Sequence, residues 1–306
     1  MSNLASIRPW IVRAIAVTAV FLGLLVLLAG PARAQISFPG AAPISAGNVT
    51  IYLKPQSTDS TDGISSTIYR NVVIYGASPN LAFILQNNSF VANSATIAGK
   101  HGSQHITANG FGDTVLEGRY TLYQQDGPGS TFRIAPYGGV VIPTGSDNVN
   151  SLMPRAGQPG TGAWATRDAL TMSYQTLDWN AAAEAGYQVN SSAAGYRFGN
   201  TFYADAAVRY RLWPRTLETV VPAEVYGFIE SNYTSMMANR ASGQNVPGTG
   251  GQLLLLDPGI IYTARLYSVT LMGLLPAYEQ VHNNSSRFNY GVLASFRFSL
   301  FTTHHW

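Results

Sequence analysis

The segment 202–213, FYADAAVRYRLW, alternates between apolar and polar positions with a period of two. Asp205, Arg209 and Arg211 occupy odd positions, whereas the even positions carry only apolar or aromatic side chains. Successive side chains of a strand point to opposite faces. The pattern therefore predicts a strand with one apolar face and one charged face, which suits either a soluble sheet or a membrane barrel.

Similar alternation recurs along the chain and predicts an all-β protein. Runs rich in β-branched and aromatic residues, separated by segments rich in Gly, Asn, Ser and Pro, mark the individual strands. We expect twelve strands, at 50–54, 66–76, 81–94, 112–123, 130–144, 165–176, 178–190, 199–213, 218–234, 251–264, 267–280 and 287–301.

The predicted connections fall into two classes. Those after the even-numbered strands are short, whereas those after the odd-numbered strands are mostly longer and rich in Gly, Ser and Asn, as at 96–110, 145–162 and 235–250. Alternating tight periplasmic turns and longer outer loops are typical of transmembrane β-barrels. A secreted β-sandwich would explain the strands but not this asymmetry.

The spacing of aromatic residues indicates which face meets lipid. Trp179 and Tyr187 lie eight residues apart on one face of a predicted strand, and Phe202 and Tyr210 repeat this spacing on the next. Eight residues of strand span roughly 26 Å, or roughly 20 Å of membrane depth when tilted, which is close to the apolar band between two aromatic girdles. The apolar face is therefore expected to face lipid and the charged face to line the lumen.

This assignment gives a set of inward charged side chains of both signs. We expect Arg119, Arg133, Arg209 and Arg211 to attract anions, with Glu117, Glu184, Asp205 and Glu224 as their partners. The full inward set is Glu117, Arg119, Arg133, Glu184, Asp205, Arg209, Arg211, Glu224, Glu230, Asp257, Glu279 and Arg297.

The N-terminal residues have the form of an export signal. Arg8 and Arg13 precede an apolar run, 14–30, and Ala32-Arg33-Ala34 has the small-x-small form of a signal-peptidase site. We expect a signal peptide at 1–34 and a mature chain from Gln35, although a retained anchor is the alternative because the run is just long enough. A short periplasmic or lumenal segment, 35–49, would precede the outer-membrane barrel, 50–306.

Composition agrees with a membrane barrel and excludes several other classes. Charged residues make up 11% of the chain, against about 25% in a typical soluble domain. Without the three arginines of the predicted signal, fifteen basic residues face fifteen acidic ones, so the formal charge of zero gives no support for nucleic-acid binding. Cysteine is absent, which excludes disulfides and thiolate chemistry.

Several segments together resemble a known family. These are GFGDTVLEGRYTLYQQDGPGSTFRIAPYGGVVIPTG (110–145), GYRFGNTFYADAAVRYRLWPR (195–215), DPGIIY (257–262), LPAYEQ (275–280) and SFRF (295–298). They are similar to the outer-membrane family of meta-pathway of phenol degradation proteins, and the G-x-GD opening at 110–113 is the most specific part. The resemblance implies a β-barrel that passes or handles small organic compounds near aromatic catabolism, and it implies no catalytic residues.

The expected function is passive transport of small organic, particularly aromatic, solutes through an outer-membrane channel. An open or gated pore and a sealed barrel that acts structurally or binds through its loops are both compatible with twelve strands. The segment before the first strand is too short for a plug domain but could act as a stopper. The expected partners are the bilayer with its lipopolysaccharide, small solutes, periplasmic chaperones and the barrel-assembly machinery.

Catalysis and metal binding have little support in the sequence. His282 with Ser285 or Ser286 is the one conceivable nucleophile and base pair, and no Gly-x-Ser-x-Gly elbow occurs. His101 and His105 could offer two imidazoles to a metal, but no nearby Cys or acidic residue completes a site. We expect neither enzymatic activity nor a cofactor, and the C-terminal LFTTHHW (300–306) has no assigned role.

Overall fold

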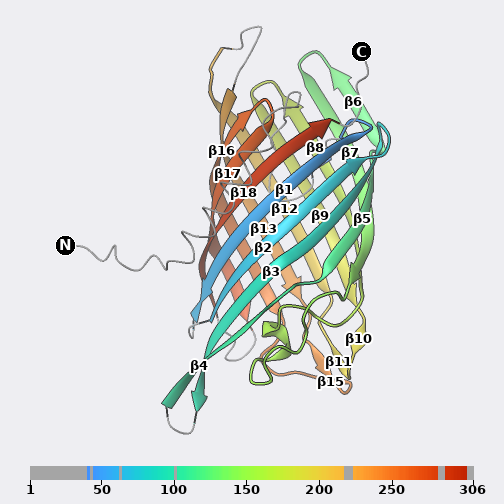
Figure 1. Ribbon diagram of the computed structural model, residues 1–306. Coiled ribbons are helices and arrows are strands. Elements are labelled where there is room, and N and C mark those ends of the chain that lie inside the picture. Colours follow the sequence, from blue (N-terminus) through green and yellow to red (C-terminus); the bar gives the residue numbers. More distant parts are fainter. Residues whose placement is uncertain are drawn as a thin grey trace, which may run out of the picture.

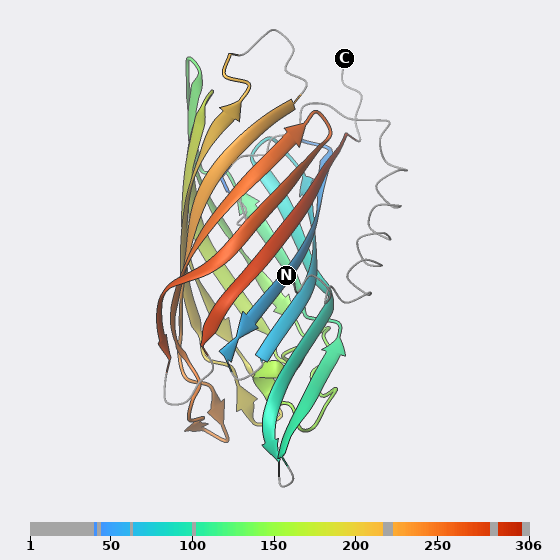
Figure 2. The ribbon, with the colours of Figure 1, turned by 90° about the vertical axis from the view of Figure 1, so that its left-hand side faces the viewer.

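In the computed structural model the protein is a closed, all-β barrel of twelve antiparallel strands (Figures 1 and 2). The structure describes residues 40–41, 44–61, 64–99, 102–216, 223–281 and 287–301. The predicted signal peptide lies outside these residues. Within the described part of the chain, no helix is long and apolar enough to span a membrane.

Each wall strand pairs with its neighbours in sequence, and the first strand pairs with the last. Val49 lies opposite Leu300, which closes the barrel. The wall strands are β1 (Asn48–Ser60), β2 (Ile64–Gly76), β3 (Leu81–Gly99), β5 (Thr114–Tyr120), β7 (Ser130–Ile142), β8 (Ala165–Thr176), β9 (Trp179–Asn190), β12 (Thr201–Trp213), β13 (Ala223–Met236), β16 (Gly251–Ala264), β17 (Tyr267–Val281) and β18 (Phe288–Phe301).

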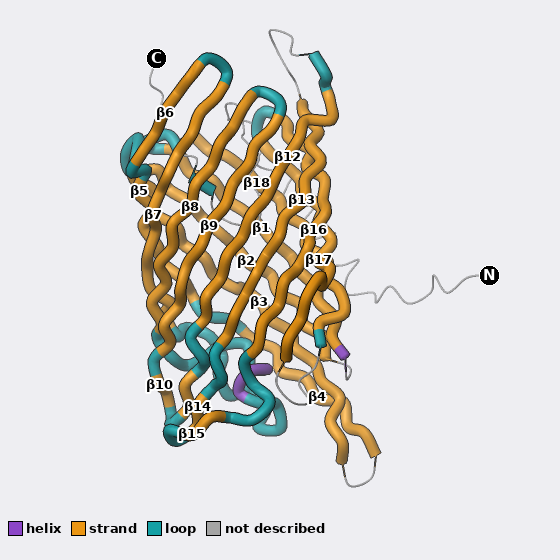
Figure 3. The backbone as a smooth tube through the Cα atoms, turned by 180° about the vertical axis from the view of Figure 1, so that it is seen from behind, coloured by secondary structure: helices purple, strands orange, loops and turns teal. Residues whose placement is uncertain are grey.

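The two ends of the barrel differ in their connections. At the short-turn end, uppermost in Figure 1, β2–β3, β8–β9 and β16–β17 are joined by 77–80, 177–178 and 265–266. Here β6 (Tyr123–Gly127) also pairs with β7 and lengthens that hairpin. At the opposite, long-loop end, two small strand pairs and the β7–β8 loop gather below the wall (Figure 3).

Two predicted connections were wrong. The segment 96–110 is not an open loop, because β3 continues to Gly99 and pairs with β4 (Gly102–Gly110) in a ribbon that projects beyond the wall (Figure 2). β1 likewise continues to Ser60, so only residues 61–63 separate it from β2. In both places the strand continues by backbone pairing with its neighbour, although the alternation of apolar and polar residues has ended. The formation of a strand depends on such pairing more than on a particular side-chain pattern.

The predicted orientation of the strand faces is confirmed. Trp179, Tyr187, Phe202 and Tyr210 are exposed on the outer surface. The odd positions of β12 point inward, and Arg209 and Arg211 there are buried. The wall therefore has the apolar exterior and polar interior of an outer-membrane barrel.

Two long loops meet in a small second sheet at the long-loop end. β10 (Ser192–Ala193) and β11 (Tyr196–Arg197) belong to the β9–β12 loop, while β14 (Arg240–Ala241) and β15 (Gln244–Asn245) belong to the β13–β16 loop. β11 pairs with β14, so the loops are joined by backbone hydrogen bonds. The β7–β8 loop contains the 3-10 helix η2 (Arg155–Gly157).

Candidate solute pathway in the barrel lumen

Four acidic side chains form one wall of the lumen. Glu184 lies directly opposite Asp205 across β9 and β12, and Glu230 lies directly opposite Asp257 across β13 and β16. All four are near the middle of their strands, and all but the half-buried Asp205 are buried. Like charges placed opposite each other on neighbouring strands repel. We refer to these four residues as the acidic wall.

A basic pair occupies the other side of the barrel. Lys54 on β1 lies directly opposite Arg70 on β2, and both are near the middle of their strands. In the strand order around the barrel, β1 and β2 lie across from β9 and β12. Lys54 interacts electrostatically with Glu230 of the acidic wall. The middle of the lumen therefore has an acidic side and a basic side.

A second charged group surrounds Glu117, whose side chain is buried. Its Oε2 accepts a hydrogen bond from Gln86 Nε2 at 2.8 Å, and its Oε1 lies 3.6 Å from Arg167 Nη1. The Arg167 guanidinium also stacks over the Tyr203 ring at 5.3 Å. Arg167, which is not among the four arginines expected to have acidic partners, forms the ion pair with Glu117.

Two tyrosines connect this group to the acidic wall. The Tyr137 hydroxyl donates to Glu184 Oε1 at 2.7 Å and lies 3.4 Å from the Tyr203 hydroxyl. Tyr137, Ala169, Gly186 and Tyr203 occupy one row across β7, β8, β9 and β12. The two small residues in the centre of this row leave room for the tyrosine rings to approach each other.

The predicted anion-attracting arginines lie in the short-turn half of the lumen. Arg133 Nη2 lies 3.7 Å from Asp126, and its Nε donates to Gln124 Oε1 at 3.2 Å. Arg211 forms ion pairs with Asp178 and, at 3.7 Å, with Glu224.

The other inward residues of the predicted set are distributed along the wall. Arg209 stacks over the Tyr226 ring at 4.7 Å. Asp257 accepts a hydrogen bond from Asn232, and Arg297 is buried opposite Ser268. The Arg211–Glu224 ion pair joins one arginine of the predicted set to one of the acidic residues expected to partner that set.

A short N-terminal segment enters the lumen near β1 and β2. Arg119 Nη1 donates to the Gly40 carbonyl at 2.6 Å, and Ala41 is fully buried. Ile44 packs against an apolar cluster on the inner wall that includes Tyr52, Ile74 and Ile84. Residues within the predicted 35–49 segment thus occupy part of the interior at the short-turn end.

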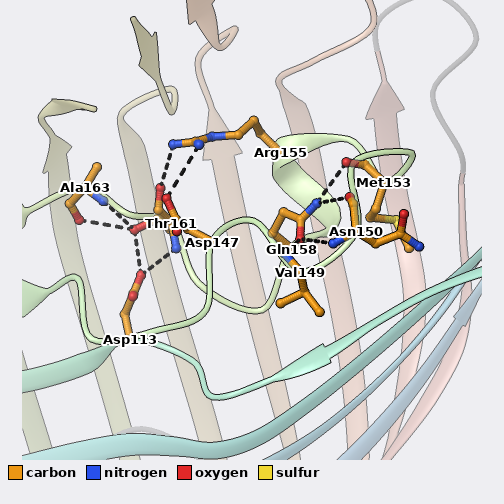
Figure 4. Close-up of polar contacts among 9 residues, drawn as sticks. All are labelled: Asp113, Asp147, Val149, Asn150, Met153, Arg155, Gln158, Thr161 and Ala163. Carbon is orange, nitrogen blue, oxygen red and sulfur yellow. Dashed lines mark hydrogen bonds and ion pairs between the residues drawn. The ribbon is translucent and has the colours of Figure 1, made fainter. Parts of the chain in front are cut away.

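Asp113 of the G-x-GD motif contacts the β7–β8 loop at the long-loop end, where Figure 4 shows it beside Thr161. Asp113, from the G-x-GD motif, accepts hydrogen bonds from Gly145 N at 2.9 Å, Thr161 N at 2.9 Å and Thr161 Oγ1 at 2.6 Å. Gly145 is the last residue of the 110–145 segment, which carries part of the family resemblance. Asp113 therefore joins both ends of the β7–β8 loop.

The same loop packs on the inner side of the β3–β4 ribbon. Met153 contacts a cluster of Ala95, Ile106 and Ala108, and Asn93 Nδ2 donates to the Gly157 carbonyl at 2.9 Å. Gln158 stabilises the loop internally by donating to the carbonyls of Asn150 and Met153 (Figure 4). The loop thus lies over part of the long-loop opening.

Sequence reasoning missed Lys54, Arg70 and Arg167. Arg70 lies beside Asn71, and Arg167 beside Asp168, so polar residues on both faces hid the inward direction. β2 also carries buried Val72 and Ile74 on its inner face, against the expected pattern. The neighbouring strand β1 did offer an indication of the inward face. Lys54 alternates in step with Thr50 and Tyr52, which are buried on that face.

Within the described residues, the structure adds no metal ligand and no catalytic partner to the histidine sites that had little support in the sequence. His105 is exposed on β4, whereas His101, His282, Ser285, Ser286 and the C-terminal histidines lie outside the described part. No group of three or more His, Cys, Asp or Glu side chains suited to a metal occurs among the described residues.

The fold and the charged lumen define this protein as an outer-membrane-type, channel-like β-barrel. The chain belongs to the family described as "Putative MetA-pathway of phenol degradation", whose model matches residues 40–271. The structure is similar to the COG4313 outer membrane channel from Pseudomonas putida F1, with a TM-score of 0.61, 12% identity, and coverage of 88% of this chain and 100% of that one. LpxR from Salmonella typhimurium is also similar, with a TM-score of 0.43, 8% identity, and coverage of 82% and 99%. No match is found among curated proteins.

Proposed function

We propose that this protein is a passive outer-membrane channel for small organic solutes, including aromatic ones. The observation that carries the proposal is the acidic wall, which faces Lys54 and Arg70 across the lumen. Glu184 beside Asp205, and Glu230 beside Asp257, concentrate acidic groups on one side of the lumen. Such a distribution suits a hydrated passage that sorts solutes by charge.

The remaining inward charges extend this field along the passage. Arg119, Arg133, Arg209 and Arg211 attract anions from the short-turn side, while Glu117, Glu184, Asp205 and Glu224 balance them. Asp257 and Arg297 belong to the same lining. The family description supports aromatic compounds as the solute class, and the chemistry involves neither catalysis nor a cofactor.

Single-channel recording tests this function directly. The chain from Gln35 onward is refolded and inserted into a planar bilayer, and currents are recorded before and after benzoate is added to one side. Discrete current steps with reversible block by benzoate are expected. A folded barrel, verified by heat-modifiable migration in electrophoresis, that gives no current would contradict transport and favour the sealed, loop-binding alternative.

Outer-membrane residence and export form part of the same proposal. The aromatic outer face suits a lipid environment with lipopolysaccharide in its outer leaflet, and periplasmic chaperones and the assembly machinery would deliver the chain there. N-terminal sequencing of the protein from an outer-membrane fraction should begin at Gln35. Recovery of a chain that retains residues 1–34 would overturn the predicted cleavage.

A further inference from the structure

Two arginines face each other in the small sheet that joins the outer loops. Arg197 on β11 lies directly opposite Arg240 on β14. Like charges opposite each other on neighbouring strands are destabilising. Among the described residues, neither arginine forms an ion pair with an acidic side chain. The pair therefore presents a concentrated positive charge at the long-loop end.

Neutral side chains hold both guanidinium groups in place. Arg197 Nη2 donates to Asn200 Oδ1 at 3.1 Å, and Arg240 Nε donates to Asn245 Oδ1 at 3.3 Å. An amide oxygen orients a guanidinium without neutralising it. Since a guanidinium has five N–H donors, each arginine retains donors for a further acceptor.

These four side chains line a cavity of about 220 Å³ between the two loops. Phe198 and Met237 contribute apolar surface to the same cavity, and no acidic residue lines it. The volume is below the roughly 300–1,000 Å³ typical of sites for drug-sized ligands. The cavity therefore suits one small molecule with an anionic end and an apolar body.

The walls of the cavity are fixed by contacts between the loops. Asn239 Nδ2 donates to the Tyr196 hydroxyl at 2.8 Å, and Asn239 Oδ1 accepts from Gly199 N at 2.8 Å. Within the β9–β12 loop, the Phe198 ring packs edge-on against Tyr196 at 5.1 Å. Because the cavity is already formed without a ligand, binding requires less ordering of its side chains and loops and therefore costs less conformational entropy.

We propose that this cavity is a capture site for small organic monocarboxylates, particularly arene carboxylates. The carboxylate lies between Arg197 and Arg240, because the planar guanidinium matches two carboxylate oxygens, and the ring lies against Phe198 and Met237. This inference rests on the proposed function for its role, since the site would concentrate solutes at the outer opening. Its binding chemistry is independent of conduction.

Calorimetric titration of the folded, detergent-solubilised chain with benzoate tests the site. The double variant Arg197→Gln/Arg240→Gln should bind benzoate at least about tenfold more weakly, as expected for lost charge-assisted hydrogen bonds. The control Arg265→Gln removes the same charge from the exposed turn at the opposite end and should bind as the unmodified protein does. Benzamide, a neutral analogue of similar shape, should bind the unmodified protein at least about tenfold more weakly than benzoate does.

Three results would overturn the site: no benzoate binding by the unmodified protein, unchanged affinity in the double variant, or equal affinity for benzamide and benzoate. Heat-modifiable migration confirms that each variant is folded. Bilayer currents from the same samples separate the two proposals. Loss of binding in the double variant together with a silent unmodified protein would retain the capture site and reject the channel.

Discussion

The ion pair between Glu117 and Arg167 spans an intervening strand. Glu117 lies opposite Gly139 on β7, and Gly139 lies opposite Arg167 on β8. Because Gly139 has no side chain, the two charged groups approach to 3.6 Å across it; a Cβ at that position would lie 2.8 Å from Glu117 Cγ. Parity along one strand predicts that Glu117 points inward. It does not identify a partner two strands away.

Neutralising part of the acidic wall should change ion selectivity. The double variant Glu184→Gln/Asp205→Asn removes two negative charges from neighbouring positions on the lumen surface. Loss of a charge shifts the free energy of a passing ion by about 1 kcal/mol at 4 Å in water, so the cation-to-anion permeability ratio should fall about fivefold or more. The reversal potential in a salt gradient measures this ratio.

The matched control is Asp168→Asn, which removes a charge from the exposed, outward face of β8. It should leave the reversal potential unchanged. The double variant removes a like-charge contact, and the amide oxygen that replaces the Glu184 carboxylate can still accept the hydrogen bond from Tyr137, so folding should survive. Equal reversal potentials in the double variant and the unmodified channel would remove the acidic wall from the ion pathway.

At the level of elements, the path of the N-terminal segment into the lumen requires its backbone to pass close to the end of β2. A Cβ at Gly76 would lie 2.4 Å from the Ser45 carbonyl oxygen and 2.6 Å from that of Ile44. Gly47 N also donates to the Gly76 carbonyl at 2.8 Å. A side chain at this position therefore cannot be accommodated while the segment keeps its path into the lumen.

The variant Gly76→Val should displace the segment and increase single-channel conductance, because the space beside Arg119 and Ile44 would open to ions. We expect a rise of about 1.5-fold or more, since ion flow follows the open space lining a pore. Gly273→Val on β17 is the control, because a Cβ there meets nothing within 4 Å. Conductance that is the same in both variants would show that the segment does not obstruct the passage.

The β7–β8 loop is the second element that a single residue positions. In Asp113→Asn, one amide N–H₂ would replace an acceptor now used by Gly145 or by Thr161. Losing a charge-assisted hydrogen bond costs about 1.5–3 kcal/mol. The free energy of opening at whichever amide loses its acceptor, Gly145 or Thr161, should therefore fall by about that amount. Hydrogen exchange measured by mass spectrometry gives this value.

The comparison variant for the loop is Asp147→Asn, which removes the partly exposed ion pair with Arg155 at 3.5 Å. Exposed pairs contribute about 0–1 kcal/mol, so the same amides should keep nearly all their protection. Slow exchange of Gly145 and Thr161 in Asp113→Asn would mean that the loop is held by other contacts, such as those of Gln158.

The elements that sequence predicted best are those with strict alternation. The sequence placed the bounds of two strands, Trp179–Asn190 and Thr201–Trp213, to within a residue or two. With an apolar outer face and a polar inner face, only one register puts every side chain on its proper side. β4 and the end of β1 escaped prediction because their polar residues occur on both faces. Each residue of the acidic wall was predicted to point inward, but their grouping and their contrast with Lys54 and Arg70 depend on how the strands pair and the barrel closes, which no local pattern reveals.

At the scale of the whole molecule, the outward face decides between a membrane barrel and a soluble one. Val208 is 52% exposed near the middle of β12, on the same face as Phe202 and Tyr210. An arginine at the bilayer midplane of a barrel costs about 2–4 kcal/mol. Val208→Arg should therefore lower the free energy of unfolding by that amount in urea titrations of the protein folded into lipid vesicles.

The control is Leu152→Arg on the β7–β8 loop, where the side chain is exposed to a similar extent, 54%, but lies beyond the wall. Because water surrounds this position, the added charge should change stability by less than about 0.5 kcal/mol. A soluble β-barrel would tolerate both arginines alike, since its exposed positions all meet water. The difference between the two variants therefore measures the depth of lipid around β12, independently of any conduction through the lumen.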